Sequence, residues 1–255
     1  MAGVRLTKKD DGILVLSIDR PEALNALNRG IVDEIDEKID EIEKDSGARC
    51  LILHSDKNFA AGADIKAMAE CDEEGAKAFA FSPTYNRLAA LRIPTVSAIE
   101  GYALGGGMEL ALATDIRIAG EGAKMGFPEV SLGIFPGAGG TIRAPRLIGA
   151  AFAKELIFSG EAVTAERALQ MGLVNRVVPD DRVFAEAYRL AGKIARRGPV
   201  AVRRAKEVID RGTAMNVESG IELEAAEWAK LFNTRDQKEG MQAFIAKRKP
   251  EFENR

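Results

Sequence analysis

The sequence predicts an α/β core followed by an all-helical C-terminal part. Segments typical of strands alternate with segments typical of helices through the first half of the chain, which favours this fold class. Beyond residue 179 almost every segment has the periodicity of a helix. Hydrophobic residues make up 46% of the 255 residues and aromatic residues only 6%, so we expect a large core built mostly from aliphatic side chains.

Four apolar segments in the first half are typical of buried strands, and each ends near turn residues. They are residues 13–18, 50–54, 95–99 and 115–119. A helix is predicted after the first strand, ending near Gly47, from apolar residues at helical spacing. These are Leu24, Leu27, Ile31, Ile35, Ile39 and Ile42. Residues 68–91 are predicted to be mostly helical, with breaks at residues 74–75 and 82–83, and residues 108–114 form a short apolar helix.

The pattern changes after Gly139. Residues 142–157 are predicted to be helical with interruptions near Pro145 and Gly149, and Thr164 is expected to cap a helix that ends near Gly172. A short strand is predicted at the next apolar segment, and only helices follow it. These segments are the strand 174–178 and the helices 199–210, 217–232 and 237–247.

Bulk properties exclude several classes of protein. The net charge of −3 and the pI near 5.5 argue against a nucleic-acid binder that relies on overall charge. Apolar runs are shorter than the roughly 20 residues of a membrane span, and the start lacks the layout of a secretory signal. Arg255 at the end carries no retention or peroxisomal tail. Cys50 and Cys71 have no metal-ligand spacing, so we expect two buried packing residues and a cytoplasmic location.

Motifs for several familiar chemistries are missing. His54 is the only histidine and ends an apolar strand, which favours a structural role over a catalytic triad. The glycine-rich segments 105–110 and 137–142 both lack the third glycine of a dinucleotide fingerprint, and no phosphate-binding P-loop motif occurs.

Two glycine-containing turns remain, at residues 59–65 and 101–110. Each follows a strand and opens a helix, where small residues allow close approach and the first N–H groups have no helical partner. Either turn alone is typical of an ordinary strand-to-helix connection. Together they could offer two N–H donors to one oxygen, the arrangement of an oxyanion hole.

Two carboxylates lie close to these turns in the sequence. Glu109 is at the start of an apolar helix, and Glu129 follows Pro128 ahead of a second glycine-rich segment. A glutamate at a helix start is often only a partner of the helix dipole. Neither residue predicts a catalytic site by itself.

Taken in order and spacing, these segments resemble the enoyl-CoA hydratase/isomerase (crotonase) family over nearly the whole chain. The matching segments are PEALNAL (21–27), FAAGADI (59–65), GYALGGGMEL (101–110), FPEVSLGIFPGAGG (127–140), GEAVTA (160–165), ALQMGLVN (168–175) and EGMQAFIAKR (239–248). The resemblance implies a spiral of ββα units in residues 1–195, carrying the coenzyme A and catalytic site. It also implies a helical trimerisation region in residues 196–255, and a trimer or, as we expect, a hexamer.

The resemblance also implies a reaction, the reversible syn addition of water to a 2-enoyl-CoA to give a 3-hydroxyacyl-CoA. The backbone N–H groups of Ala63 and Gly106 would bind the thioester oxygen. Glu109 would act as the base that activates water toward Cβ, and Glu129 as the acid that protonates Cα. Close carboxyl groups commonly separate their pKa values in this way.

Coenzyme A is part of the substrate in this scheme, and no metal, nicotinamide or flavin is implied. The resemblance places the coenzyme A moiety over one loop and adds contacts from Gly106. The loop residues are Ala61, Ala63, Asp64, Ile65 and Lys66. Phe244 and Lys247 match positions that reach the adenine of a neighbouring subunit's ligand, although simple core packing is an equal alternative for Phe244.

Three alternatives stay open at the level of the sequence. The first is Δ3,Δ2-enoyl-CoA isomerisation, which needs one acid–base carboxylate; the presence of both glutamates favours hydration. The second is a hydratase specialised for cyclic dienoyl or branched acyl groups, because the sequence of the expected acyl-pocket wall, residues 68–85, gives no acyl preference. The third is an RNA-binding homologue, using basic residues that are more typical of solvated helix faces. These are residues 196–197, 203–204 and 247–249.

Overall fold

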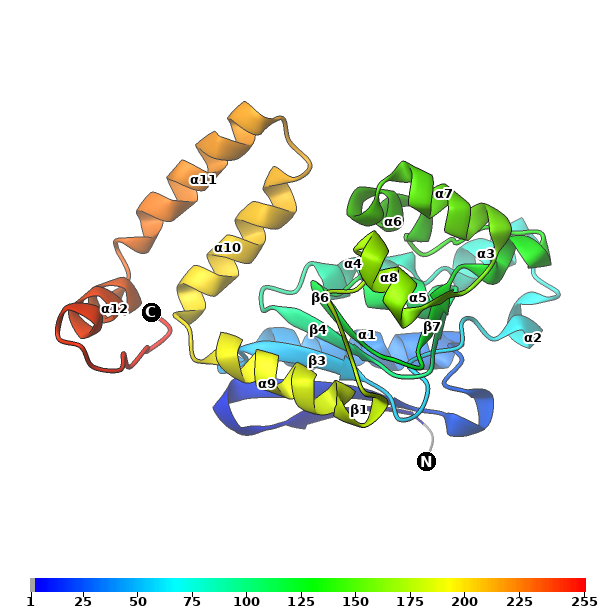
Figure 1. Cartoon of the computed structure of the whole chain (residues 1–255), viewed down its shortest axis with the longest axis horizontal. Helices are drawn as coiled ribbons and strands as arrows, with labels where there is room; N and C mark the ends of the chain where they lie inside the picture. Colours follow the sequence, from blue (N-terminus) through cyan, green and yellow to red (C-terminus); the bar gives the residue numbers. More distant parts are fainter. Residues whose placement is uncertain (1–2) are drawn as a thin grey trace.

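The computed structural model describes residues 3–255 and is built on a six-stranded sheet (Figure 1). The strand order is β1-β2-β3-β4-β6-β9, with β1 antiparallel to β2 and every other pair parallel. The strands are β1 (Gly3–Lys8), β2 (Ile13–Asp19), β3 (Cys50–His54), β4 (Thr95–Ile99), β6 (Ile116–Gly120) and β9 (Arg176–Val178). The carboxyl ends of parallel strands lie at the same edge of a sheet, so the segments that follow β3, β4 and β6 lie together.

A second, smaller sheet lies beyond the carboxyl ends of these strands. It consists of β5 (Tyr102–Leu104), β7 (Lys124–Gly126) and β8 (Val163–Thr164), in the order β5-β7-β8. A bridge between Ala60 and Ala103 adds the segment after β3 to the edge of this sheet. The chain therefore passes from the large sheet to the small one three times in succession, as expected of a spiral of repeated units.

Helices cover both faces of the large sheet because its parallel strands are apolar on both sides. Leu14 and Leu16 of β2 face a core cluster shared with α1 (Arg29–Lys44), whereas Ile13 and Val15 face α9 (Val183–Ala195). Asn28 accepts a hydrogen bond from Ile31 N at 2.9 Å and thereby caps α1.

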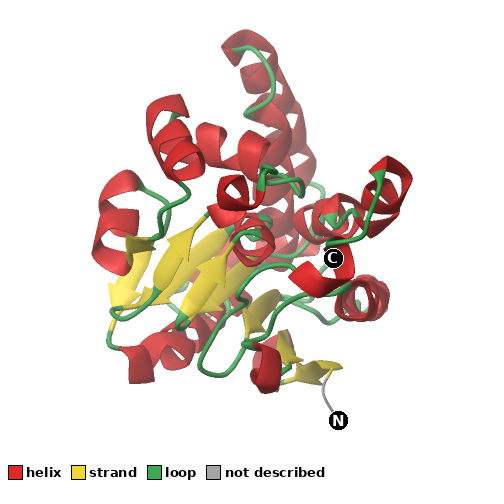
Figure 2. Ribbon diagram, turned by 90° about the vertical axis from the view of Figure 1, so that its right-hand side faces the viewer, coloured by secondary structure: helices red, strands yellow, loops and turns green. Residues whose placement is uncertain are grey.

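The other helices and the 3-10 turns are short, and Figure 2 shows helices on the outside of the strands. The helices are α2 (Ile65–Met68), α3 (Glu73–Phe79), α4 (Ser82–Ala89), α5 (Gly106–Leu112), α6 (Gly140–Ile148), α7 (Ala150–Ser159) and α8 (Ala165–Met171). The 3-10 turns are η1 (Asp10–Gly12), η2 (Pro21–Ala23), η3 (Pro128–Leu132) and η4 (Asp180–Arg182).

Three C-terminal helices extend away from the sheets (Figure 1). They are α10 (Pro199–Gly212), α11 (Val217–Leu231) and α12 (Arg235–Ile245). The final residues turn back, and Asn254 donates a hydrogen bond to the carbonyl oxygen of Ser46 at 3.0 Å. Large apolar side chains remain exposed on these helices, among them Ile209, Val217, Ile221, Trp228, Phe244 and Ile245.

Several predicted boundaries were wrong for local reasons. The first helix begins at Arg29, because Leu24 and Asn25 adopt left-handed conformations with φ of 52° and 57°. The break between α2 and α3 falls before residues 74–75, because Asp72 caps α3 through Gly75 N at 2.8 Å. Pro145 lies inside α6 without interrupting it.

Two further expectations from the sequence need correction. Cys50 is buried as expected, but Cys71 is exposed, since it lies in the surface connection between α2 and α3. The strands β1, β5, β7 and β8 were not predicted.

Within residues 3–255, no helix is long and apolar enough to span a membrane.

Candidate active site

A cavity of about 550 Å³ lies where the segments after β3, β4 and β6 come together. Parallel α/β sheets commonly bind ligands at this edge, beyond the carboxyl ends of their strands. Its lining residues are Ala61, Gly62, Ala63, Ile65, Met68, Ala76, Phe79, Ala80, Phe81, Gly105, Gly106, Glu109, Pro128, Glu129, Leu132, Gly133, Ile134, Phe135, Gly137 and Ala138.

The structure brings the two predicted N–H donors together. Leu27 pairs with the segment around Ala63, donating to Gly62 O at 2.7 Å and accepting from Asp64 N at 2.7 Å. A methyl group placed on Gly106 would lie 3.7 Å from Ala63 N, so the two residues are neighbours. Within residues 3–255, neither the Ala63 N–H nor the Gly106 N–H donates a hydrogen bond, which leaves both available to a ligand.

Gly105, which precedes α5, is required by its backbone conformation and by close packing. Gly105 has φ of 50°, and a side chain there would also meet the Glu129 carboxylate at 2.8 Å. The Gly105 N–H donates to Gly126 O at 2.9 Å, which joins this turn to β7. From α4, the buried hydroxyl of Tyr85 donates to Gly106 O at 3.0 Å. These contacts hold the Gly106 peptide in place.

Glu109 lies in the first turn of α5 and is buried. Its Oε1 accepts hydrogen bonds from the backbone N–H groups of Ala138 and Gly140, both at 2.7 Å. Burial raises the pKa of Glu109 above its usual value, and the two amides and the nearby Arg143 partly oppose this effect. The carboxylate is therefore oriented by the second glycine-rich segment.

Arg143 supports that segment from outside the cavity. Its guanidinium group donates to Ala138 O at 3.1 Å and to the Asn86 side chain at 2.7 Å. Asn86 follows Tyr85 in α4, so one helix contacts both the Gly106 turn and, through Arg143, the turn that holds Glu109.

Glu129 differs from Glu109 in its surroundings. It lies in η3, is half-buried, and its Oε2 atom is buried with no hydrogen-bond partner among the described residues. Burial raises its pKa to about 7, and the charge of Glu109 contributes in the same direction. Two carboxyl groups with different environments therefore line one cavity, which is the arrangement that general acid–base catalysis uses.

The other predicted ligand-binding residues are divided between two places. Ala61 and Ile65 line the cavity, whereas Lys66 is exposed outside it. Asp64 instead pairs with Arg20 at 3.1 Å and caps α2 through Lys66 N at 3.3 Å.

Phe244 and Lys247 do not line the cavity. Phe244 is 85% exposed on α12, and Lys247 is also exposed. Figure 1 shows α12 on the opposite side of the molecule from α2. Core packing within this chain is therefore the wrong explanation of Phe244.

Sequence reasoning missed some residues of this region. Leu132 forms an apolar part of the wall that was not predicted, whereas Phe79 and Phe81 line the cavity and belong to the expected wall segment 68–85. The contacts by which Tyr85 and Arg143 hold the two turns were not predicted. The apolar residues of the short helices carried a weak signal for a ligand pocket. Nothing in the sequence indicated which atoms Tyr85 and Arg143 would contact.

Comparison with known proteins agrees with this geometry. Residues 8–255 match the enoyl-CoA hydratase/isomerase family. A short-chain-enoyl-CoA hydratase of Clostridium acetobutylicum is 43% identical over 98% of both chains. A crotonyl-CoA hydratase of Syntrophomonas wolfei is 39% identical, over 97% of this chain and 96% of its own. The crystal structure of an enoyl-CoA hydratase from Bacillus anthracis superposes with a TM-score of 0.94 at 37% identity, covering 99% of both chains.

The chain belongs to the enoyl-CoA hydratase/isomerase family. This confirms the family predicted from the glycine turns and the glutamates, and the crotonase-type fold predicted with it.

Proposed function

We propose that the protein is an enoyl-CoA hydratase, a hydro-lyase that adds water reversibly to 2-enoyl-CoA thioesters. The observation that carries this proposal is the cavity that contains Glu109, Glu129 and the unpaired N–H groups of Ala63 and Gly106. Several relatives that are 39–43% identical to this chain are named enoyl-CoA or crotonyl-CoA hydratases, which supports the same reaction.

In the proposed mechanism, the thioester oxygen accepts hydrogen bonds from Ala63 N and Gly106 N. Addition at Cβ moves the electron pair of the double bond toward this oxygen and forms an enolate. Fixed donors stabilise that charge without reorganising, and one such donor is worth about 10²–10³ in rate in other enzymes.

The two glutamates hold the water and divide the proton transfers between them. Ionised Glu109 takes a proton from the water as the water oxygen bonds to Cβ. Protonated Glu129 then gives a proton to Cα, which yields the 3-hydroxyacyl product. The proton on Glu109 returns to Glu129 before the next turnover. The raised pKa of Glu129 supports its role as the acid.

We propose that the coenzyme A moiety lies along residues 61–66, with Gly106 contacting the thioester. Phe244 and Lys247 would contact the adenine end in a neighbouring subunit, because α12 lies away from the cavity of its own chain. The acyl group would lie against Phe79, Phe81 and Leu132. Among the described lining residues, Glu109 and Glu129 are the only charged ones, which favours an uncharged acyl chain.

A substrate panel tests the proposed reaction. Crotonyl-CoA should be converted to 3-hydroxybutyryl-CoA, which is measured as a loss of absorbance by the conjugated double bond. Branched and cyclic enoyl-CoA esters test the specialised alternatives. A 3-enoyl-CoA tests isomerisation. Conversion of 3-enoyl-CoA without any hydration of 2-enoyl-CoA would establish the isomerase alternative instead.

The RNA-binding alternative has less support in the structure. Arg204 pairs with Glu207 at 2.7 Å, and Arg248 pairs with Glu239 at 2.6 Å. Carboxylates of the same chain therefore neutralise part of the basic positions that this alternative requires. No specific observation on the described residues favours a nucleic-acid partner.

A cytoplasmic location stays a prediction.

We propose that the protein assembles as a trimer or a pair of trimers through its C-terminal helices. Light scattering should then give three or six times the 27.5 kDa mass of the chain. Ile221 is 59% exposed on α11, so Ile221→Asp should lower this mass by placing a charge in an apolar contact. Glu224→Gln, also exposed on α11, is the control and should leave the mass unchanged. A wild-type protein that stays monomeric at micromolar concentration would contradict the proposal.

A further inference from the structure

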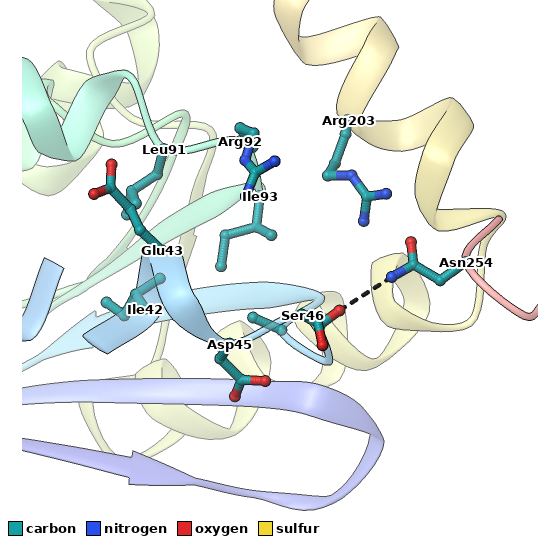
Figure 3. A pocket seen from close by; sticks show the side chains of 10 residues that line it. Ile42, Glu43, Asp45, Ser46, Leu91, Arg92, Ile93, Arg203 and Asn254 are labelled. Atoms are coloured by element: carbon teal, nitrogen blue, oxygen red, sulfur yellow. Dashed lines mark hydrogen bonds between the residues drawn. The ribbon is translucent and has the colours of Figure 1, made fainter. Parts of the chain in front are cut away.

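A second cavity lies at the opposite edge of the large sheet, among the amino ends of its parallel strands. It has a volume of about 160 Å³ and is enclosed by the end of α1, the segment before β4, α10 and the C-terminal residues. Figure 3 shows Arg203 extending from α10 toward the core, with Arg92 bordering the same opening. Asn254 closes one side through its hydrogen bond to Ser46.

Three arginines gather around this cavity. Arg92 and Arg203 line it, and Arg49 lines an adjoining space that shares Ala48, Ile93 and Arg203 with it. Arg49 and Arg92 come directly before β3 and β4, which are neighbours in the sheet. The parallel arrangement of the strands therefore brings these two side chains to one edge.

The three guanidinium groups lack partners within the part of the chain that the structure describes, residues 3–255. No carboxylate lies within 4.0 Å of any of them, and none donates a hydrogen bond. The Nη1 atom of Arg49 is buried without any partner. Arg203 is half-buried and Arg92 is exposed, so the costly unpaired donor of the group is the buried Nη1 atom of Arg49. Three like charges grouped without a carboxylate partner repel one another, and an anion bound among them would relieve this repulsion.

Two carboxylates, Glu43 and Asp45, also line the cavity, and each pairs with a cation outside the three arginines. Glu43 pairs with Arg87 at 3.1 Å, and Asp45 pairs with Lys8 at 2.6 Å. Asp236 accepts hydrogen bonds from the backbone N–H groups of the C-terminal residues. Burial lowers the pKa of Arg203, and the positive charges of Arg49 and Arg92 lower it further, more than Asp236 compensates. The local charge around Arg203 is therefore positive.

We propose that this cavity binds a phosphate group that joins the core to the C-terminal helices. Guanidinium groups present several N–H donors in a plane and match the oxygens of phosphate. The cavity is smaller than the roughly 300–1,000 Å³ of pockets that hold drug-sized ligands, which favours inorganic phosphate or the terminal phosphate of a nucleotide over a whole coenzyme A. The site lies at the sheet edge opposite the proposed active site and does not depend on the proposed function.

Thermal unfolding in inorganic phosphate tests this site. A ligand that binds only the folded chain raises the unfolding temperature, so saturating phosphate should raise it by about 2–4 °C or more over chloride at equal ionic strength. Arg92→Gln and Arg203→Gln should each lose this shift and keep wild-type hydratase activity. Arg182→Gln, an exposed arginine of η4, is the matched control and should keep the shift.

Further measurements identify the source of the phosphate and test whether a general salt effect or pairing with another copy explains the arginines instead. If adenosine 3′,5′-bisphosphate gives the shift at lower concentration than inorganic phosphate, and Arg203→Gln loses that shift, the phosphate is carried on a nucleotide. An equal shift in all four proteins would show a general salt effect and overturn the proposal. If phosphate has no effect on the wild type, the proposal is wrong. A lower mass of Arg203→Gln in light scattering would then show that the arginines pair with acidic residues of another copy.

Discussion

Gly106→Pro is expected to abolish hydration of crotonyl-CoA while the protein still folds. Proline removes the N–H that we assign to the thioester oxygen, and loss of one such donor costs about 10²–10³ in rate in other enzymes. Gly106 is the first residue of α5, where proline is well tolerated because the N–H has no helical partner. Turnover number, unfolding temperature and the affinity for a coenzyme A ester should be measured on the same preparation.

Gly106→Ala is the matched control for this substitution. It keeps the N–H, and the added methyl group makes only ordinary contacts, 3.6 Å from Phe81 and 3.7 Å from Ala63 N. Gly107→Ala is unsuitable, because its methyl group would collide with the carbonyl oxygen of Ala60. A folded Gly106→Pro protein with a turnover number close to that of Gly106→Ala would refute the proposed donor.

Glu109→Gln and Glu129→Gln are each expected to lower kcat for hydration by about 10²–10⁴-fold. Glutamine keeps the size and polarity of the side chain but removes the group that transfers a proton. Both proteins should still bind coenzyme A esters, since the backbone of the cavity is unchanged. Glu166→Gln, an exposed glutamate of α8, is the control and should keep full activity. If Glu109→Gln still hydrates at the wild-type rate, Glu109 is not the base and isomerisation gains support.

The pH dependence of kcat/KM separates the roles of the two glutamates. Glu129 has its pKa raised from 4.5 to about 7, so the wild-type value should fall as pH rises through about 7 and the acid loses its proton. Glu109 must be ionised, and its pKa is also raised, which places the acidic limb above pH 4.5. Residual activity of Glu129→Gln should lack the alkaline limb. Because the folded pKa of Glu129 exceeds its unfolded value, its contribution to stability is present below about pH 4.5 and is lost as pH rises through about 7.

The large sheet was predictable because its central strands are mostly apolar segments of strand length that end near turn residues. The segments that became β3 and β4 were predicted with the boundaries that the structure shows. The small sheet was not predictable, because β5 and β7 have three residues each and gain their pairing only from neighbours distant in sequence. Pro145 gave a misleading signal for a helix break, since tertiary packing keeps α6 continuous across it.

The candidate site was predicted in part, and for a related reason. Neither the glycine turns nor the glutamates predicted a catalytic site alone, so Ala63, Gly106, Glu109 and Glu129 became site predictions only through the order and spacing that resemble the family. The structure adds that Glu109 is held by two amides whereas one oxygen of Glu129 has no partner among the described residues. That difference depends on contacts between residues about 30 positions apart, which periodicity does not reveal.

The two neighbouring residues Tyr85 and Asn86 connect α4 to both turns of the candidate site. Tyr85 contacts the peptide of Gly106, and Asn86 holds Arg143 against the turn that orients Glu109. We therefore expect a displacement of this helix to move the proposed donor at Gly106 and the Glu109 carboxylate in the same direction. The distance between these two groups should then vary less than the position of either one, which would preserve the proposed alignment of water and thioester while the whole region moves.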